Sequence, residues 1–249
     1  MSYWDAFFKL HSDLPREGPG SDEATAEALR RLPALPDSPR VLDVGCGPGR
    51  QTLVLARKLQ TPVVAVDMHE PYLDQLRASA QKAGLTDLVI AHPGRMEALE
   101  EEPGSIDLIW SEGAIYIVGF VEGLKLWRPL LRTSGLVVVT EATWLTENPS
   151  AEVEAFWGAA YPAMTDVDGN IRNAAAAGFE VFDHFALPSS AWWNEYLTPL
   201  EERAAKLRVE AAGDPELTQV LEEHDREADI CRRFGDTFGY VFYLMRKAN

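Results

Sequence analysis

The sequence predicts an α/β fold in which one mostly parallel sheet carries helices on both faces. The first reason is a series of short apolar runs, which are typical of parallel strands buried between two helical layers. Seven such runs lie at 41–44, 62–67, 88–91, 106–110, 135–141, 179–185 and 238–246. The second reason is that stretches with apolar residues at helical spacing separate most of the runs, as in 70–84. We therefore expect a seven-stranded sheet in a single domain that spans residues 1–249.

The first run leads directly into a glycine-rich loop. Residues 41–44 are followed by Gly45-Cys46-Gly47-Pro48-Gly49, and a helical pattern begins after this loop. Glycine allows a sharp turn and lets a ligand come close to the backbone. A strand, a glycine loop and a helix in this order start a mononucleotide-binding unit.

Two aspartates lie near the ligand end of the first two strands. Asp67 ends the second run, 22 residues after Gly45, a spacing that suits a carboxylate holding ribose hydroxyls. Asp43 lies inside the first run, where a carboxylate is costly unless it is paired. Two interpretations of Asp43 stay open: a locally hydrogen-bonded side chain, or one that faces the ligand and holds a hydrogen-donating or positively charged group.

With these motifs the chain resembles the class I S-adenosylmethionine (SAM) dependent methyltransferases. The matching segments, in the expected order, are 41–49, 64–68, 96–99, 104–116 and 130–135. The resemblance implies a Rossmann-like sheet whose last strand, 238–246, inserts antiparallel between the fifth and sixth strands. It also implies SAM as the cofactor, and it says almost nothing about the methyl acceptor.

The resemblance further implies which residues bind the cofactor. They are Asp43, Gly45, Cys46, Gly47, Gly49, Asp67, Met68, Arg95, Met96 and Glu112. Asp43 and the loop would hold the methionine end, and Asp67 the ribose hydroxyls. Met96 fits the apolar position under the adenine ring, whereas Arg95 stands where the family commonly has an acidic or small polar residue.

The candidate catalytic residues are Glu112, Tyr116 and His184. The first two follow the fourth strand, and ligands sit at the carboxyl ends of parallel strands; Glu112 could instead cap the next helix. Further candidates for a base, needed only if the acceptor loses a proton, are His11, His92 and Glu141. No His, Cys and acidic residues show metal-ligand spacing, so we expect no metal.

Composition narrows the partners and the location. With 39 acidic and 23 basic residues, the net charge of −16 repels phosphate backbones and disfavours nucleic acid. No apolar run approaches the ~20 residues that cross a bilayer, and no basic amphipathic stretch suits a membrane surface. Cys46 and Cys231 form no disulfide framework, which favours a cytoplasmic protein.

Two segments beside the sheet are expected to shape the acceptor site. The N-terminal helical segment, 1–38, begins with the aromatic residues Tyr3, Trp4, Phe7 and Phe8, which either dock on the core or form a lid. The insertion before the last strand, 188–235, is expected to be a helical cap, either a substrate lid or a dimerisation arm; a homodimer is therefore one option. Its Trp192, Trp193 and Tyr196 suit the wall of an apolar pocket.

The expected function is SAM-dependent methyl transfer to a small-molecule acceptor. One alternative is a SAM-binding module without catalysis. The other is an NAD-dependent oxidoreductase, against which the G-x-G-x-G spacing argues, because a dinucleotide site uses G-x-G-x-x-G.

Overall fold

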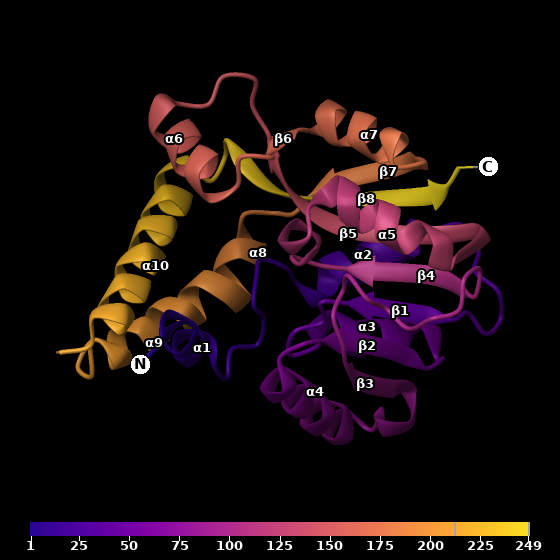
Figure 1. Ribbon diagram of the computed structural model, residues 1–249, viewed down its shortest axis with the longest axis horizontal. Coiled ribbons are helices and arrows are strands. Elements are labelled where there is room, and N and C mark those ends of the chain that lie inside the picture. The colour runs from indigo at the N-terminus through magenta and orange to yellow at the C-terminus, as the bar shows by residue number, and fades with distance from the viewer. Residues whose placement is uncertain (212, 249) are drawn as a thin grey trace.

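One twisted sheet forms the centre of the computed structural model, which describes residues 1–211 and 213–248 (Figure 1). Its main strands are β1 (Val41–Val44), β2 (Val63–Asp67), β3 (Val89–Pro93), β4 (Ile106–Ser111), β5 (Leu131–Trp144), β7 (Phe179–Ala186) and β8 (Phe238–Lys247). They follow the order β3-β2-β1-β4-β5-β8-β7, and the short β6 (Thr165–Asp166) pairs with the end of β5. β8 runs antiparallel to both β5 and β7. The predicted sheet and the antiparallel insertion of the last strand are confirmed.

Helices cover both faces of the sheet, as predicted. On one face lie α2 (Asp22–Arg30), α3 (Arg50–Leu59) and α4 (Glu70–Ala83), and on the other lie α5 (Phe120–Trp127) and α7 (Val167–Ala176). Turns of 3₁₀ helix lie at Thr86–Leu88, Ile115–Ile117 and Arg128–Leu130. β5 is longer than the expected 135–141, because its ends find partners: Leu131 pairs with Ile106 and Trp144 with Phe238.

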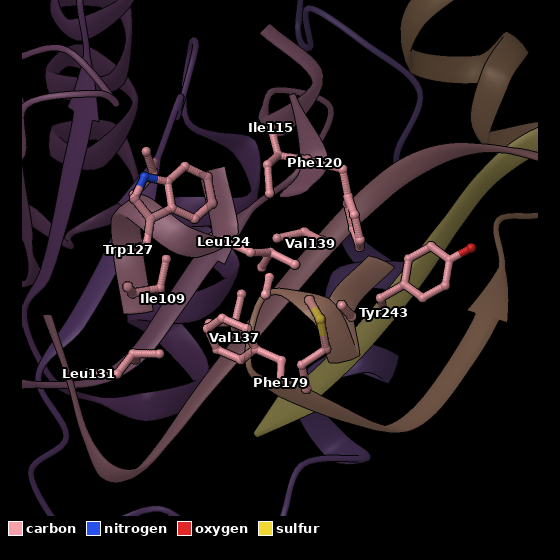
Figure 2. Close-up of a cluster of buried hydrophobic side chains, with 14 of the residues drawn as sticks. Ile109, Ile115, Phe120, Leu124, Trp127, Leu131, Val137, Val139, Phe179 and Tyr243 are labelled. Carbon is pink, nitrogen blue, oxygen red and sulfur yellow. The ribbon is translucent and has the colours of Figure 1, made fainter. Parts of the chain in front are cut away.

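A large apolar core lies between α5 and the sheet (Figure 2). Leu124 and Trp127 of α5 are fully buried, together with Ile109 of β4 and Val137 of β5. Burial of each such side chain contributes ~1.5–3 kcal/mol. The Trp127 indole also donates a hydrogen bond to the Met96 carbonyl at 2.9 Å, so the core fixes a loop at the carboxyl end of the sheet.

A second group of helices, the helical layer, packs beside the carboxyl end of the sheet. It contains α1 (Tyr3–His11), α6 (Ala151–Ala160), α8 (Ser190–Trp192), a π-helical turn (Trp193–Leu197), α9 (Thr198–Leu207) and α10 (Pro215–Phe234). Figure 1 shows α1 beside α9 and α10, and buried Leu10, Leu200 and Leu221 belong to the apolar cluster that these helices share. The 188–235 insertion thus joins the N-terminal helix instead of extending the sheet.

Candidate active site

The glycine loop is folded onto the end of β2. The amides of Gly45 and Cys46 both donate to the Val66 carbonyl, at 2.9 and 3.0 Å. The amide of Gly47 donates to Asp67 Oδ2 at 2.9 Å, and Asp67 Oδ1 accepts from the His69 amide at 2.9 Å. Asp67 therefore positions the glycine loop. Asp67 and the loop both line the cavity, where the remaining lone pairs of the carboxylate can accept hydrogen bonds.

All three loop glycines have positive φ angles, which disfavour any residue with a side chain. Gly45 has φ +69°, and a Cβ on it would collide with Ala114. Gly47 has φ +53°, and its Cβ would lie 3.6 Å from Glu17 across the cavity. Gly49 has φ +81°, and a Cβ on it would collide with Leu76 of α4, although Gly49 does not belong to the cavity lining.

Asp43 lies beneath the loop and not in the cavity lining. It accepts hydrogen bonds from the Thr52 hydroxyl at 2.5 Å and from the Gln51 amide at 3.4 Å. Burial raises the pKa of Asp43 to about 7, and these two hydrogen bonds oppose the shift. Of the two interpretations of Asp43, the structure supports local hydrogen bonding, because its donors come from the first turn of α3.

Glu112, directly after β4, is a buried carboxylate at the cavity wall. Its Oε1 accepts from the Trp110 indole at 2.8 Å and from the Thr25 hydroxyl at 2.7 Å. Its Oε2 faces Arg16 Nη1 at 3.4 Å. Burial raises the pKa of Glu112, while Arg16 and the two hydrogen bonds oppose the shift. A carboxylate held so fully is better suited to positioning than to proton transfer.

Arg16, which the sequence reasoning missed, is the centre of an ion-pair network. Its side chain is only 5% exposed and donates to Asp22 at 3.0 Å and to Glu195 at 2.8 Å. Arg50, the first residue of α3, pairs with the same two acids at 3.0 and 3.3 Å. The network joins the N-terminal segment, α2, the glycine loop and the helical layer. No sequence spacing signals it, because Glu195 lies 179 residues from Arg16.

The cavity has a volume of about 660 Å³ and two different ends. The loop end is lined by the glycine loop, Asp67, Met68 and Met96, as well as by Arg95, which forms an ion pair with Glu97 at 2.7 Å. The opposite end is lined by aromatic side chains of α1 and by Tyr72, Tyr116, Ile117 and Tyr161. Trp4, Tyr116 and Ile117 are exposed by 62%, 43% and 64%, respectively, because they face this open space.

Glu17 spans the two ends. Its Oε2 lies 2.8 Å from His11 Nδ1, and its Oε1 is buried without a hydrogen-bond partner among the described residues. Glu17 raises the pKa of Tyr72 together with burial of that phenol. The His11 ring stacks on Phe7, with ring centroids 4.1 Å apart. His11 therefore holds Phe7 and Glu17, two residues that line the cavity, in place.

Several predicted residues do not meet at this cavity. His184 is exposed on β7 and outside the lining, as is His92 at the end of β3. The expectation that Trp192, Trp193 and Tyr196 form the wall of this cavity is wrong, because they pack in the apolar cluster of the helical layer and do not belong to the lining. Of the two candidate lids, only the N-terminal segment lines the cavity with aromatic side chains.

Within residues 1–211 and 213–248, no three His, Cys, Asp or Glu side chains are grouped to hold a metal ion. In the same part of the chain, no helix combines the length and apolar character of a membrane span.

Comparisons with known proteins agree with this geometry. Residues 41–135 match the model of the methyltransferase domain family. A 24-methylenesterol C-methyltransferase 2 of Oryza sativa subsp. japonica is 28% identical over 206 residues, which cover 76% of this chain and 56% of that protein. The chain spans about half the length of the curated relatives it matches.

Solved structures share the fold over nearly the whole chain. A SAM-dependent methyltransferase of Geobacter sulfurreducens, in complex with S-adenosylhomocysteine, has a TM-score of 0.81 at 18% identity and covers 98% of both chains. The [4+2]-cyclase SpnF has a TM-score of 0.75 at 19% identity, with 98% of this chain and 93% of that chain covered.

The domain model matched by residues 41–135, the glycine loop and the shared fold support a class I SAM-dependent methyltransferase. The cofactor of this class is SAM, and the residues present fit it. Gly47 borders the cavity, Asp67 offers acceptor oxygens, and Met68 and Met96 offer apolar surfaces.

Proposed function

We propose that this protein transfers the methyl group of SAM to a small-molecule acceptor within the described cavity. The observation that carries the proposal is that one cavity joins the loop end, with Asp67, to the aromatic end under α1. Bound SAM supplies a methyl group on a sulfonium, which is already a good leaving group. What the chain adds is orientation, and holding two reactants in line can supply ~7–11 kcal/mol of the barrier.

The cofactor would be held by residues of the loop end. Asp67 would accept hydrogen bonds from the ribose hydroxyls, and Met68 and Met96 would contact the adenine. Arg16 lines the cavity with its guanidinium already paired to Asp22 and Glu195, whereas Glu17 Oε1, which has no hydrogen-bond partner among the described residues, suits the ammonium group of the cofactor. Glu112 would act by positioning Arg16.

The acceptor would lie at the aromatic end, enclosed by α1. A cavity of this size, apolar with a few polar groups, is typical of small-molecule sites. The net charge of −16 supports a substrate other than nucleic acid. A homodimer and a cytoplasmic location stay predictions.

A second candidate is a SAM-binding protein that does not transfer methyl groups. One similar structure is named as a [4+2]-cyclase, so this fold occurs in a protein with another activity in its name. The cavity geometry is compatible with both functions, and only turnover separates them.

Turnover is tested by incubating the full chain with SAM and a panel of small amines, phenols and carboxylic acids, and by measuring S-adenosylhomocysteine and methylated product by mass spectrometry. We expect product with at least one acceptor class and at least a tenfold loss in Asp67→Ala. A wild-type protein that binds SAM and yields no product with any class would support the non-catalytic alternative.

A further inference from the structure

Two pairs of aromatic side chains line the aromatic end of the cavity. Tyr116 and Tyr161 form an edge-to-face pair with centroids 6.0 Å apart. On the α1 side, Trp4 and Phe7 form a second edge-to-face pair at 5.7 Å. All four residues line the cavity. Aromatic faces carry negative partial charge, and a set of them attracts a cation.

A buried carboxyl group stands behind this wall. Glu141, at the end of β5, is 1% exposed, and its Oε2 has no hydrogen-bond partner among the described residues. The Tyr161 hydroxyl lies close enough to Glu141 to oppose the rise in its pKa. Burial raises the pKa of Tyr116, and the charges of Glu227 and Glu141 add to this shift. Burial favours the protonated form of Glu141 in the free protein, and a cationic ligand group at the adjacent wall would favour its ionised form.

The cavity offers no comparable free positive charge. Each of the three arginines that line it, Arg16, Arg50 and Arg95, is already paired with a carboxylate. Its remaining basic side chain, His69, is stacked on Phe8 with centroids 3.9 Å apart. A carboxylate or phosphate on the acceptor would therefore meet Glu17, which lines the cavity, and find no free basic side chain among the described lining residues.

We propose that the acceptor is an amine, bound with its nitrogen against Tyr116 and Tyr161 and in front of Glu141; this rests on the proposed methyl transfer. The nitrogen lone pair forms the new N–C bond, and the C–S bond breaks with its electron pair going to sulfur. The positive charge thereby moves from sulfur to nitrogen. The ring faces and Glu141 stabilise the ammonium that forms, which then loses a proton to water if it carries one.

The test measures the binding of two probes of similar shape. One is the cation phenethyltrimethylammonium, and the other is its neutral carbon analogue, 3,3-dimethyl-1-phenylbutane, which carries a hydroxyl group for solubility. Calorimetry is run on the full chain, both alone and saturated with S-adenosylhomocysteine. The wild type should bind the ammonium at least tenfold more tightly than the neutral probe. Glu141→Gln should reduce that preference about tenfold and leave S-adenosylhomocysteine affinity within twofold.

Control variants separate a loss of the binding preference from a loss of folding. Glu154→Gln, the same change at an exposed residue of α6, should behave as wild type. Tyr116→Phe keeps the ring face and should retain the preference, whereas Tyr116→Leu should lose it several-fold. Equal affinity for both probes in the wild type, or an unchanged preference in folded Glu141→Gln, would overturn the amine proposal. Failure to bind S-adenosylhomocysteine would instead contradict the proposed function.

Discussion

At the scale of single residues, the buried carboxyl groups near the cavity differ in the hydrogen bonds that they accept. Asp43 and Glu112 accept hydrogen bonds from fixed donors, whereas Glu141 keeps an oxygen without a partner among the described residues. Burial raises the pKa of Glu141 to about 8, and the nearby Tyr161 hydroxyl opposes the shift. Glu141 therefore binds a proton in the folded protein at a higher pH than in the unfolded chain.

This pKa predicts a pH-dependent stability difference between wild type and Glu141→Gln. The folded pKa lies above the unfolded value of 4.5, so the folded state binds the proton more tightly and wild type loses stability as pH rises from 4.5 to about 8. The limiting slope is ~1.4 kcal/mol per pH unit. Melting curves at pH 5.5 and pH 8 should show the variant gaining on wild type, while Glu154→Gln should not. A pH-independent difference would contradict the assignment.

The sequence located the acids but could not assign their partners. Asp67 was recognisable because its distance from the glycine loop is fixed by one βαβ unit. The role of Asp43 depends on whether Thr52 and Gln51 turn toward it, and the network of Arg16 depends on Glu195, which only the tertiary fold brings near. Spacing along the chain carries no information on such contacts.

At the scale of elements, α1 has two faces with different tasks. Its inner face, with Ala6 and Leu10, packs in the helical layer. Its other face presents Trp4 and Phe8 to the cavity. The helical spacing of the aromatic residues was visible in the sequence, which left open whether they dock or form a lid; the structure shows that one helix docks and lines the cavity at once.

Two alanine substitutions in α1 should separate these tasks. Leu10→Ala removes a side chain that is 1% exposed and should cost ~2–5 kcal/mol of unfolding free energy. Trp4→Ala, at a residue 62% exposed, should change stability by only ~0.5 kcal/mol. Trp4→Ala should nevertheless raise KM for the acceptor found in the turnover screen and leave the SAM affinity unchanged. An unchanged acceptor KM would show that this face of α1 does not contact the substrate.

At the scale of the whole molecule, the helical layer is tied to the glycine loop through Glu195, which pairs with both Arg16 and Arg50. The backbone link from the Gly20 amide to the Ala191 carbonyl, at 3.1 Å, lies in the same region. Cofactor site and helical layer therefore share one set of contacts, although they belong to distant parts of the chain.

Glu195→Gln should loosen this connection without unfolding the protein. Because Glu195 is 26% exposed, the stability loss should be only ~0.5–1 kcal/mol. Amide hydrogen exchange in residues 16–20 should become several-fold faster, since Arg16 loses its shortest ion pair. Exposed Glu202→Gln on α9 serves as the control. Unchanged exchange in residues 16–20 would show that the network does not hold this segment.

The most direct test of the central claim is a calorimetric titration of the full chain with S-adenosylhomocysteine, in wild type and in Asp67→Ala. The cavity geometry predicts binding by wild type and at least tenfold weaker binding by the variant, because each lost charge-assisted hydrogen bond is worth ~1.5–3 kcal/mol. Asp87→Ala, at an exposed acid near β3, should match wild type. Absence of binding in folded wild type, or equal affinity in folded Asp67→Ala, would contradict the assignment of this cavity as a SAM site.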